Sequence, residues 1–255
     1  MKILVAIKQV PSRDSSLRVN DAAAWSEDPD ASENNEPDAY ALEEALQLKE
    51  KLGGEVIALC AGPEAASQTI REALAKGADR AIHVEEDNLH GMDVLSIARV
   101  LAAAAAQEQP DLILTGLQSD DLGHGQTGVV MAELLGLAHA TIIMQVEKTG
   151  EGIRVKRELE DGWFQHVDLP LPAVLTIQSG INKLRYATLM GIKKAKTKEV
   201  RKVDAASLGT AAGGGVKLER VYMPQRSKQT RLLEGSAAEQ ASQLVEILKH
   251  EVRAL

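Results

Sequence analysis

The chain has 255 residues, which is enough for one large α/β domain or two small domains with a sizeable core. Its formal net charge of −8 argues against nucleic acid as the main partner, because phosphate binding requires a basic surface. Its single cysteine, Cys60, excludes internal disulfides and cysteine-rich metal sites, and we expect it to be a small buried side chain in a reducing compartment.

The first half of the chain alternates strand and helix patterns. Runs of branched apolar residues predict strands at Ile3–Ile7, Val56–Cys60, Arg80–Val84 and Leu112–Thr115. Apolar residues at helical spacing predict helices at Asp38–Leu52, Glu64–Lys76, Asp93–Gln107 and from about Gln126 to Leu135. Strands separated by helices of about 10–15 residues indicate βαβ units, so we expect an α/β fold with a mostly parallel, doubly wound sheet.

The second half begins with strands and ends with a helix. Strand patterns cover Ala140–Val146, Ile153–Leu159 and Trp163–Leu169, and the last two form an antiparallel hairpin around Glu160-Asp161-Gly162. From about Val200 the pattern loosens into a flexible joint at Ala211–Gly215, a strand-like run at Val216–Met223 and a helix at Ser236–Val252. We therefore expect an α/β domain at 1–200 and a C-terminal arm at 201–255 that packs on another chain.

Several common functional patterns are missing. The first strand begins at the N-terminus and no run of about 18 apolar residues occurs, so we expect a cytoplasmic chain without membrane insertion. The six histidines show no metal-ligand spacing. Glu43 and Glu44 are adjacent on a predicted helix and do not face each other, which argues against a paired-carboxylate acid/base site.

The chief candidate for ligand binding is the glycine-rich loop, Gly116–Gly128. It follows a predicted strand and opens a helix, at the edge of the sheet where open α/β folds bind ligands. Free N–H groups around Gly125–Gly128 and the Thr127 hydroxyl suit a phosphate. No P-loop lysine is present, and an ordinary glycine-rich turn remains an alternative. Asp120 and Asp121 have no nearby cationic catalyst, so we expect nucleotide binding without phosphoryl transfer.

The stretch from Val155 to Thr176 resembles the signature of the beta subunit of electron transfer flavoproteins. The positions that carry the resemblance are Arg157, Glu160-Asp161-Gly162, Gln165, Val167, Pro172 and Val174-Leu175-Thr176. The resemblance covers nearly the whole chain, from Val5-Ala6-Ile7-Lys8 to the helix after Glu234-Gly235-Ser236. It differs from the family pattern at Gly125, where many members carry asparagine. The resemblance implies an adenine-nucleotide-binding fold of the kind also found in universal stress proteins.

The family resemblance implies that the glycine-rich loop holds the phosphate of a structural AMP. The matching positions in the loop are Ser119, Asp121, Gly125, Gln126 and Thr127. Contacts to adenine and ribose are implied at Ala6 and at Ala61-Gly62, and Asn35 also fits the family pattern. The resemblance further implies a heterodimer with an alpha subunit, which holds most of the redox FAD and contacts the C-terminal arm.

A second implied site is a docking segment, Tyr186–Ile192, whose leucine anchors partner dehydrogenases. The implied contacts are Tyr186, Leu189 and Ile192, and an apolar anchor in a polar surround is a common interface hot spot. Lys193–Lys198 would steer an acidic partner surface. Without the resemblance, Leu189 would more often be a buried side chain, and Arg185 and Tyr186 are alternatively buttresses of the segment.

The expected function is therefore that of an electron carrier subunit. Amine dehydrogenases or acyl-CoA dehydrogenases are the implied electron donors, and the chain supplies docking and rigidity rather than bond-making residues. Two alternatives remain open. One is the beta subunit of an electron-bifurcating flavoprotein, with a second FAD in place of AMP. The other is a stand-alone nucleotide-binding module of the same fold, which would form a homo-oligomer.

Overall fold

The computed structural model describes residues 1–15, 18–19, 25–26, 32–87, 92–210, 215–216, 219–223 and 230–254. The chain divides into two compact units, Met1–Val221 and Tyr222–Leu255, which are described separately. Residues 211–214 of the expected joint lie outside the described residues. Within the described part, no helix combines the length and the apolar character needed to cross a bilayer.

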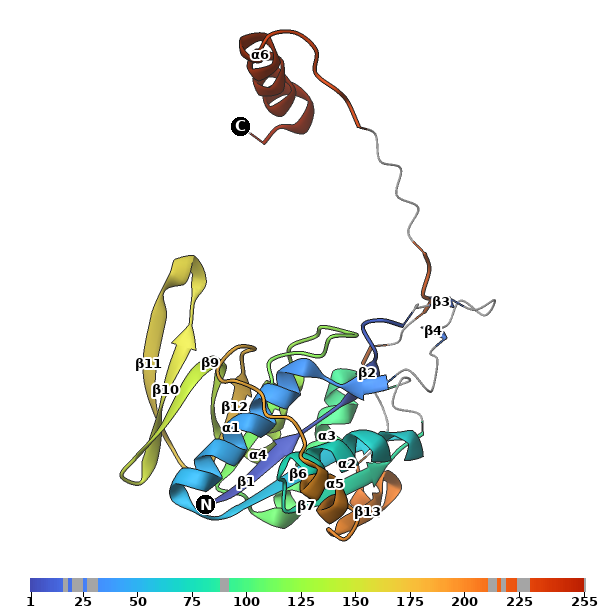
Figure 1. Cartoon of the computed structure of the whole chain (residues 1–255), viewed down its shortest axis with the longest axis vertical. Coiled ribbons are helices and arrows are strands. Elements are labelled where there is room, and N and C mark those ends of the chain that lie inside the picture. Colours follow the sequence, from blue (N-terminus) through green and yellow to red (C-terminus); the bar gives the residue numbers. More distant parts are fainter. Residues whose placement is uncertain are drawn as a thin grey trace. The chain divides into compact units, whose positions relative to one another are not determined.

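The first unit is built on one large sheet (Figure 1). Its strands are β1 (Lys2–Ala6), β6 (Glu55–Gly62), β7 (Arg80–Glu85), β8 (Leu112–Gly116), β9 (Ala138–Thr149), β10 (Gly152–Glu158), β11 (Phe164–Pro170), β12 (Ala173–Ile177) and β13 (Val200–Asp204). Their order is β11-β10-β9-β12-β8-β1-β6-β7-β13. All neighbours from β9 to β13 run parallel, whereas β10 is antiparallel to both β9 and β11. The mostly parallel sheet predicted from the sequence is confirmed.

Helices cover both faces of this sheet. They are α1 (Glu36–Leu52), α2 (Ser67–Lys76), α3 (Val94–Glu108), α4 (Thr127–Leu135) and α5 (Leu189–Ala195), with short 3-10 turns at Glu64–Ala66, Glu160–Gly162 and Ala205–Leu208. Alternate residues of β6 point to opposite faces. Val56, Ala58 and Cys60 pack in a core with α1, α2 and α5. Ile57 and Leu59 pack in a second core with α3 and α4, so the sheet is doubly wound.

Two small ribbons lie between β1 and α1 in the sequence. β2 (Gln9–Pro11) pairs with β5 (Ser32–Asn34), and β3 (Arg18–Val19) pairs with β4 (Trp25–Ser26), both antiparallel. The predicted hairpin is confirmed as β10 and β11, which project as a long twisted ribbon (Figure 1). Cys60 is fully buried, as expected, and its burial raises the pKa of the thiol to about 12.

The structure adds elements that the sequence patterns did not indicate. β12 is a continuous buried run, α5 has seven residues, and β13 is an edge strand that pairs with β7. The first unit therefore continues past the boundary expected at residue 200. The strand-like prediction at Val216–Met223 is wrong for Val216 and Glu219–Met223, which have no partner strand, and Lys217 and Leu218 lie outside the described residues.

The second unit contains the predicted C-terminal helix. α6 (Ala237–Ile247) continues as a π-helical turn at Leu248–Val252. The Ser236 hydroxyl accepts from the backbone N–H of Glu239, and the Glu239 carboxylate accepts from the backbone N–H of Ser236 at 2.8 Å, which is a capping box. α6 buries none of its residues within this chain.

Candidate functional site

The connectivity of the sheet places a topological switch point at the carboxyl ends of β1 and β8. From β1 the chain builds β6 and β7 on one side and then crosses to β8 on the other side. Open α/β sheets bind their ligands at such a switch point. Ala6 ends β1, and Ala61 lies near the end of the neighbouring β6, so these two predicted contacts share one edge of the sheet.

A buried carboxylate, Asp38, joins the two strand ends at this switch point. Its oxygens accept hydrogen bonds from the backbone N–H groups of Lys8 and Gly116, both at 2.9 Å. Burial raises the pKa of Asp38 to about 7, and the hydrogen bonds oppose this shift. A Cβ on Gly116 would lie 2.4 Å from the Asp38 carboxylate, so only glycine allows this approach. The sequence analysis missed Asp38, because its partners are far away in the sequence.

Asn35 lies behind the glycine-rich loop and shapes it. Its side chain donates to the carbonyl of Gln118 at 3.0 Å and accepts from the N–H of Asp120 at 2.9 Å. Asn35 is 1% exposed. The family resemblance places Asn35 at the nucleotide, and in the structure both ends of its amide bind the loop. Asn35 therefore fixes the backbone of the glycine-rich loop.

Two cations neutralise the acidic residues of the loop. The Lys8 ammonium lies 2.6 and 2.8 Å from the Asp121 oxygens and 3.5 Å from the Ser119 hydroxyl. Arg13 contacts Asp120 at 3.0 Å and also pairs with Glu36. Asp120 and Asp121, for which the sequence indicates no nearby cationic catalyst, each lie beside a cation that is distant in the sequence. Burial pushes the pKa of Asp121 upward, but the bonds from Lys8, Ser119 and Leu122 outweigh it and hold the pKa below its usual value.

The N-terminus of α4 lies at the end of the glycine-rich loop. Gln126 is the cap residue, and no side chain of the described residues caps the free N–H groups of this turn. Gly128 packs the turn onto β8 and β12, since its Cβ would lie 2.6 Å from Thr115 and 2.7 Å from Thr176. Uncapped N–H groups and the helix dipole fit a phosphate group. Gly125 has a φ of +64°, which places the turn in a conformation that favours glycine.

The predicted docking residues lie on the surface. The exposed fractions are 91% for Tyr186, 81% for Leu189 and 46% for Ile192. The alternative of a buried Leu189 is therefore wrong. The sequence analysis missed Met190, which is 61% exposed beside Leu189. Leu189 is the first residue of α5, and the Thr188 side chain caps this helix by accepting from the N–H of Gly191 at 3.0 Å.

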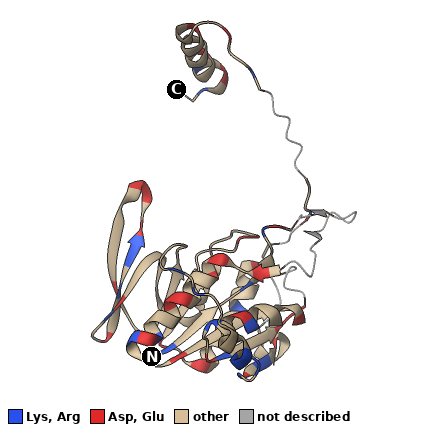
Figure 2. Cartoon of the chain, viewed as in Figure 1, with Lys and Arg blue, Asp and Glu red and all other residues tan. Residues whose placement is uncertain are grey.

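The lysines that follow the docking segment divide into two groups. Lys193, Lys194 and Lys196 are exposed at the basic end of α5 (Figure 2). Lys198 instead donates to the carbonyls of Leu74 and Ala78 at 2.8 and 2.5 Å, at the C-terminal end of α2. Burial lowers the pKa of Lys198. Only the exposed lysines are placed to steer a partner.

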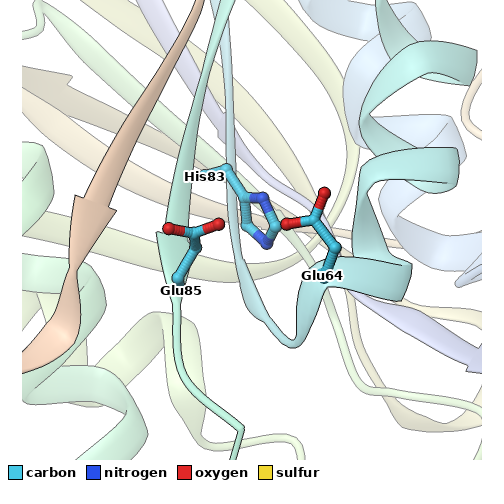
Figure 3. Close-up of side chains that lie close together, drawn as sticks. All are labelled: Glu64, His83 and Glu85. Carbon is cyan, nitrogen blue, oxygen red and sulfur yellow. The ribbon is translucent and has the colours of Figure 1, made fainter.

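A cluster of histidine and glutamate side chains lies beside Ala61, at the carboxyl ends of β6 and β7. Ligand atoms of Glu64, His83 and Glu85 lie within 4.8 Å of one another (Figure 3). The ammonium of Lys202 is 2.7 Å from both carboxylates, so an internal cation already bridges them. His83 Nε2 lies 3.0 Å from the carbonyl oxygen of Gly62 and fixes the turn after β6. We interpret the cluster as an ion-pair network that supports this turn.

Comparisons with known proteins agree with this architecture. The family model for the electron transfer flavoprotein domain matches residues 26–208. An electron transfer flavoprotein subunit beta of Methylophilus methylotrophus is 38% identical, with 97% of this chain and 98% of the relative covered. The corresponding subunits of Bacillus subtilis (strain 168) and Sus scrofa are 37% and 45% identical over 87% and 66% of this chain, and 87% and 67% of their own lengths. The chain therefore belongs to the family of electron transfer flavoprotein beta subunits, which are electron carriers.

Proposed function

We propose that the chain binds one AMP structurally in the glycine-rich loop and pairs with an alpha subunit that holds most of the redox FAD. The observation that supports this most strongly is the uncapped N-terminus of α4 at the switch point of the sheet. The FAD supplies the electron-carrying chemistry of the heterodimer.

Different residues of the chain would bind different parts of the nucleotide. N–H groups at Gly125, Gln126 and Thr127 bind the phosphate, with the Ser119 and Thr127 hydroxyls beside them. Ala6 and Ala61 have small side chains at the ends of β1 and β6, which leaves room for adenine and ribose. Asp121 keeps Lys8 next to Ser119 through their ion pair. This set of donors suits an adenine nucleotide that stays bound rather than one that reacts.

The docking segment would bind the electron donor. Leu189 is the anchor, Tyr186 and Ile192 enlarge its apolar contact, and the exposed lysines of α5 attract an acidic rim. The partner that fits is a dehydrogenase of the amine or acyl-CoA type with an apolar pocket bordered by carboxylates. The chain would thereby position the donor, while the electron passes to the flavin.

Gly125 supports a second candidate function. A Cβ at Gly125 would meet only the carbonyl oxygen of Leu117, at 3.8 Å, so a bulkier diphosphate has space at this turn. The alternative is a beta subunit of a bifurcating flavoprotein that holds a second FAD in place of AMP. The stand-alone nucleotide-binding module is not favoured, because the relatives are named as subunits.

Cofactor counting separates the two candidates. The chain is co-expressed with its alpha subunit, and the nucleotides are extracted from the purified heterodimer. One FAD and one AMP per heterodimer is the expected result. Two FAD and no AMP would support bifurcation and refute the structural AMP.

The Leu189→Ala variant tests docking. We expect electron transfer from a dehydrogenase to fall on the order of ten-fold, because a central apolar anchor is lost. FAD and AMP contents should not change, since Leu189 is 81% exposed. Leu134→Ala, at a 43% exposed position of α4, is the matched control. Unchanged electron transfer in Leu189→Ala would refute the docking role.

A further inference from the structure

Two adjacent glutamates on α1 hold the base of the docking segment. Glu43 and Glu44 are only 5% and 7% exposed, although neither belongs to an acid/base site. Their carboxylates diverge, as expected for neighbours on a helix. Glu43 binds Arg185 and Glu44 binds Asn182, so both reach the residues that precede the docking segment. We call these four residues the clamp.

Arg185 is the most strongly bound member of the clamp. Its Nε and one terminal nitrogen donate to the two oxygens of Glu43 at 2.7 and 3.0 Å, which is a bidentate pair. The other terminal nitrogen donates to Glu50 at 2.7 Å. The backbone N–H of Arg185 also donates to Glu43, at 3.3 Å. All three guanidinium nitrogens are therefore directed toward α1, and away from the exposed side chains that follow.

Asn182 gives the clamp a second attachment. Its amide donates to the carbonyl of Tyr40 and to the carboxylate of Glu44, both at 3.2 Å. Burial raises the pKa of Glu44, and the hydrogen bond from Asn182 opposes this shift. The chain is thus attached to α1 at Asn182 and again at Arg185, the residue immediately before Tyr186.

The C-terminal end of the docking segment is attached to α2. A Cβ on Gly191 would lie 2.2 Å from the carbonyl oxygen of Ala75, so the backbone of α5 rests directly on α2. Between these fixed points, Tyr186 and Leu189 are 91% and 81% exposed and bury little surface of their own. Their arrangement depends on the two attachments, because exposed apolar side chains do not order a segment by themselves.

We propose that Arg185 is a positioning residue, which holds the docking segment through Glu43 in the shape that binds the electron donor. A segment that is ordered before association loses less conformational freedom on binding. The proposal explains why two acidic residues of α1 are buried near the surface. It rests on the proposed docking function for its biological role, whereas the positioning itself is tested without any dehydrogenase.

The first test is hydrogen exchange in the intact heterodimer. The probes are the amides of Gly191 and Ile192, which donate to the side chain and the carbonyl of Thr188 at 3.0 and 2.9 Å. We expect Arg185→Met to speed their exchange on the order of ten-fold, because a largely buried charge pair is broken. Arg154→Met is the matched control, since Arg154 forms an equally bidentate pair with the exposed Asp168. Wild-type exchange in Arg185→Met would overturn the proposal.

A milder variant keeps the test decisive if Arg185→Met does not fold. Glu43→Gln keeps the shape of the side chain and removes its charge. We expect faster exchange of the same two amides, with a smaller effect than in Arg185→Met. Exchange at the wild-type rate in Glu43→Gln would overturn the proposal in the same way.

The second test separates positioning from direct contact with the donor. Electron transfer is measured with a purified acyl-CoA dehydrogenase and with a purified amine dehydrogenase. If Arg185 acts only by ordering the docking segment, the effects of Arg185→Met and Leu189→Ala on the rate are less than multiplicative in the double variant Arg185→Met/Leu189→Ala. If the effects of the two substitutions on the rate are fully multiplicative, Arg185 contacts the donor independently of Leu189, and this result would overturn the proposal. If Leu189→Ala alone has no effect, the docking function fails, and the hydrogen exchange result still decides the positioning role.

Discussion

The Lys8→Met substitution tests how the glycine-rich loop is held. Lys8 follows β1, and its ammonium contacts both oxygens of Asp121 at 2.6 and 2.8 Å. Methionine keeps most of the length of the side chain and removes the charge. Asp121 then remains as a carboxylate whose side chain is only 7% exposed and has lost its cation. We expect the turn around Asp121 to open more often.

The size of the effect follows from the burial of the pair. Breaking a fully buried ion pair costs about 3–5 kcal/mol, and an exposed pair is worth about 0–1 kcal/mol. The Lys8 side chain is 32% exposed and that of Asp121 is 7% exposed, so the pair lies between these limits. We therefore expect a loss of about 2 kcal/mol in the free energy of opening the loop, which is about a thirty-fold increase in exchange rate.

The pH dependence of this effect has a defined sign. The pKa of Asp121 is held below its unfolded value, so the stabilisation is present above about pH 4 and is lost as the pH falls through the folded pKa. The difference between wild type and Lys8→Met should therefore be complete at pH 7. It should shrink as the pH falls through the folded pKa of Asp121, which lies below the usual aspartate value, because the carboxylate is then protonated.

Hydrogen exchange of the assembled heterodimer measures this opening directly. Suitable probes are the amides of Leu122 and Gly123, which donate to Asp121 at 2.7 Å and to Ser119 at 2.9 Å. Rates are corrected for intrinsic exchange at each pH. Lys202→Met is the control, because Lys202 bridges two carboxylates outside the loop. A loss below about 0.5 kcal/mol at pH 7, or a loss that does not shrink as the pH falls through the range in which Asp121 becomes protonated, would refute the assigned role of the pair.

Three further substitutions test the packing and ionisation of the site. Gly128→Ala places a Cβ 2.6 Å from Thr115 and should destabilise the protein by about 1–3 kcal/mol in urea unfolding, with reduced AMP content on extraction. Gly125→Asn should stay within about 1 kcal/mol of wild type and keep its AMP, because asparagine tolerates a φ of +64°; loss of AMP would show that the bare backbone is required. Asp38 has a pKa raised from 3.8 to about 7, so its contribution to stability should be complete below about pH 4 and be lost as the pH rises through about 7. Asp38→Asn should lack this component of the urea-unfolding profile, and an identical profile would contradict the assignment.

The fold was largely predictable because its elements follow local patterns. The alternation of short apolar strands with amphipathic helices is visible from β1 to α4, and the hairpin of β10 and β11 is marked by its acidic turn. β13 was not visible, because its side chains alternate between exposed and half-buried at the edge of the sheet. α5 was missed since seven residues span barely two turns, which is too short for a helical period.

The candidate site was predictable only where its residues are contiguous. The glycine-rich loop combines a strand end, glycines and a helix start in one stretch, so its place in the fold followed from the sequence. Lys8 and Asp121 are 113 positions apart, and their contact depends on the sheet order that places β1 beside β8. Asp38 reads as an ordinary residue in the first turn of a helix. Its role appears only when Lys8 and Gly116 are brought to its two oxygens.

Helix α1 connects the two proposed sites of the chain. Its first turn carries Asp38, which ties the ends of β1 and β8 together beneath the glycine-rich loop. One turn later it carries Glu43 and Glu44, which hold the base of the docking segment. Asp38, Glu43 and Glu44 are buried, and each accepts at least one hydrogen bond from outside α1. Because a helix is rigid over such a short distance, one element sets the positions of both the glycine-rich loop and the docking segment. A polar residue on the inner side of α1 can therefore affect either site without contacting a ligand.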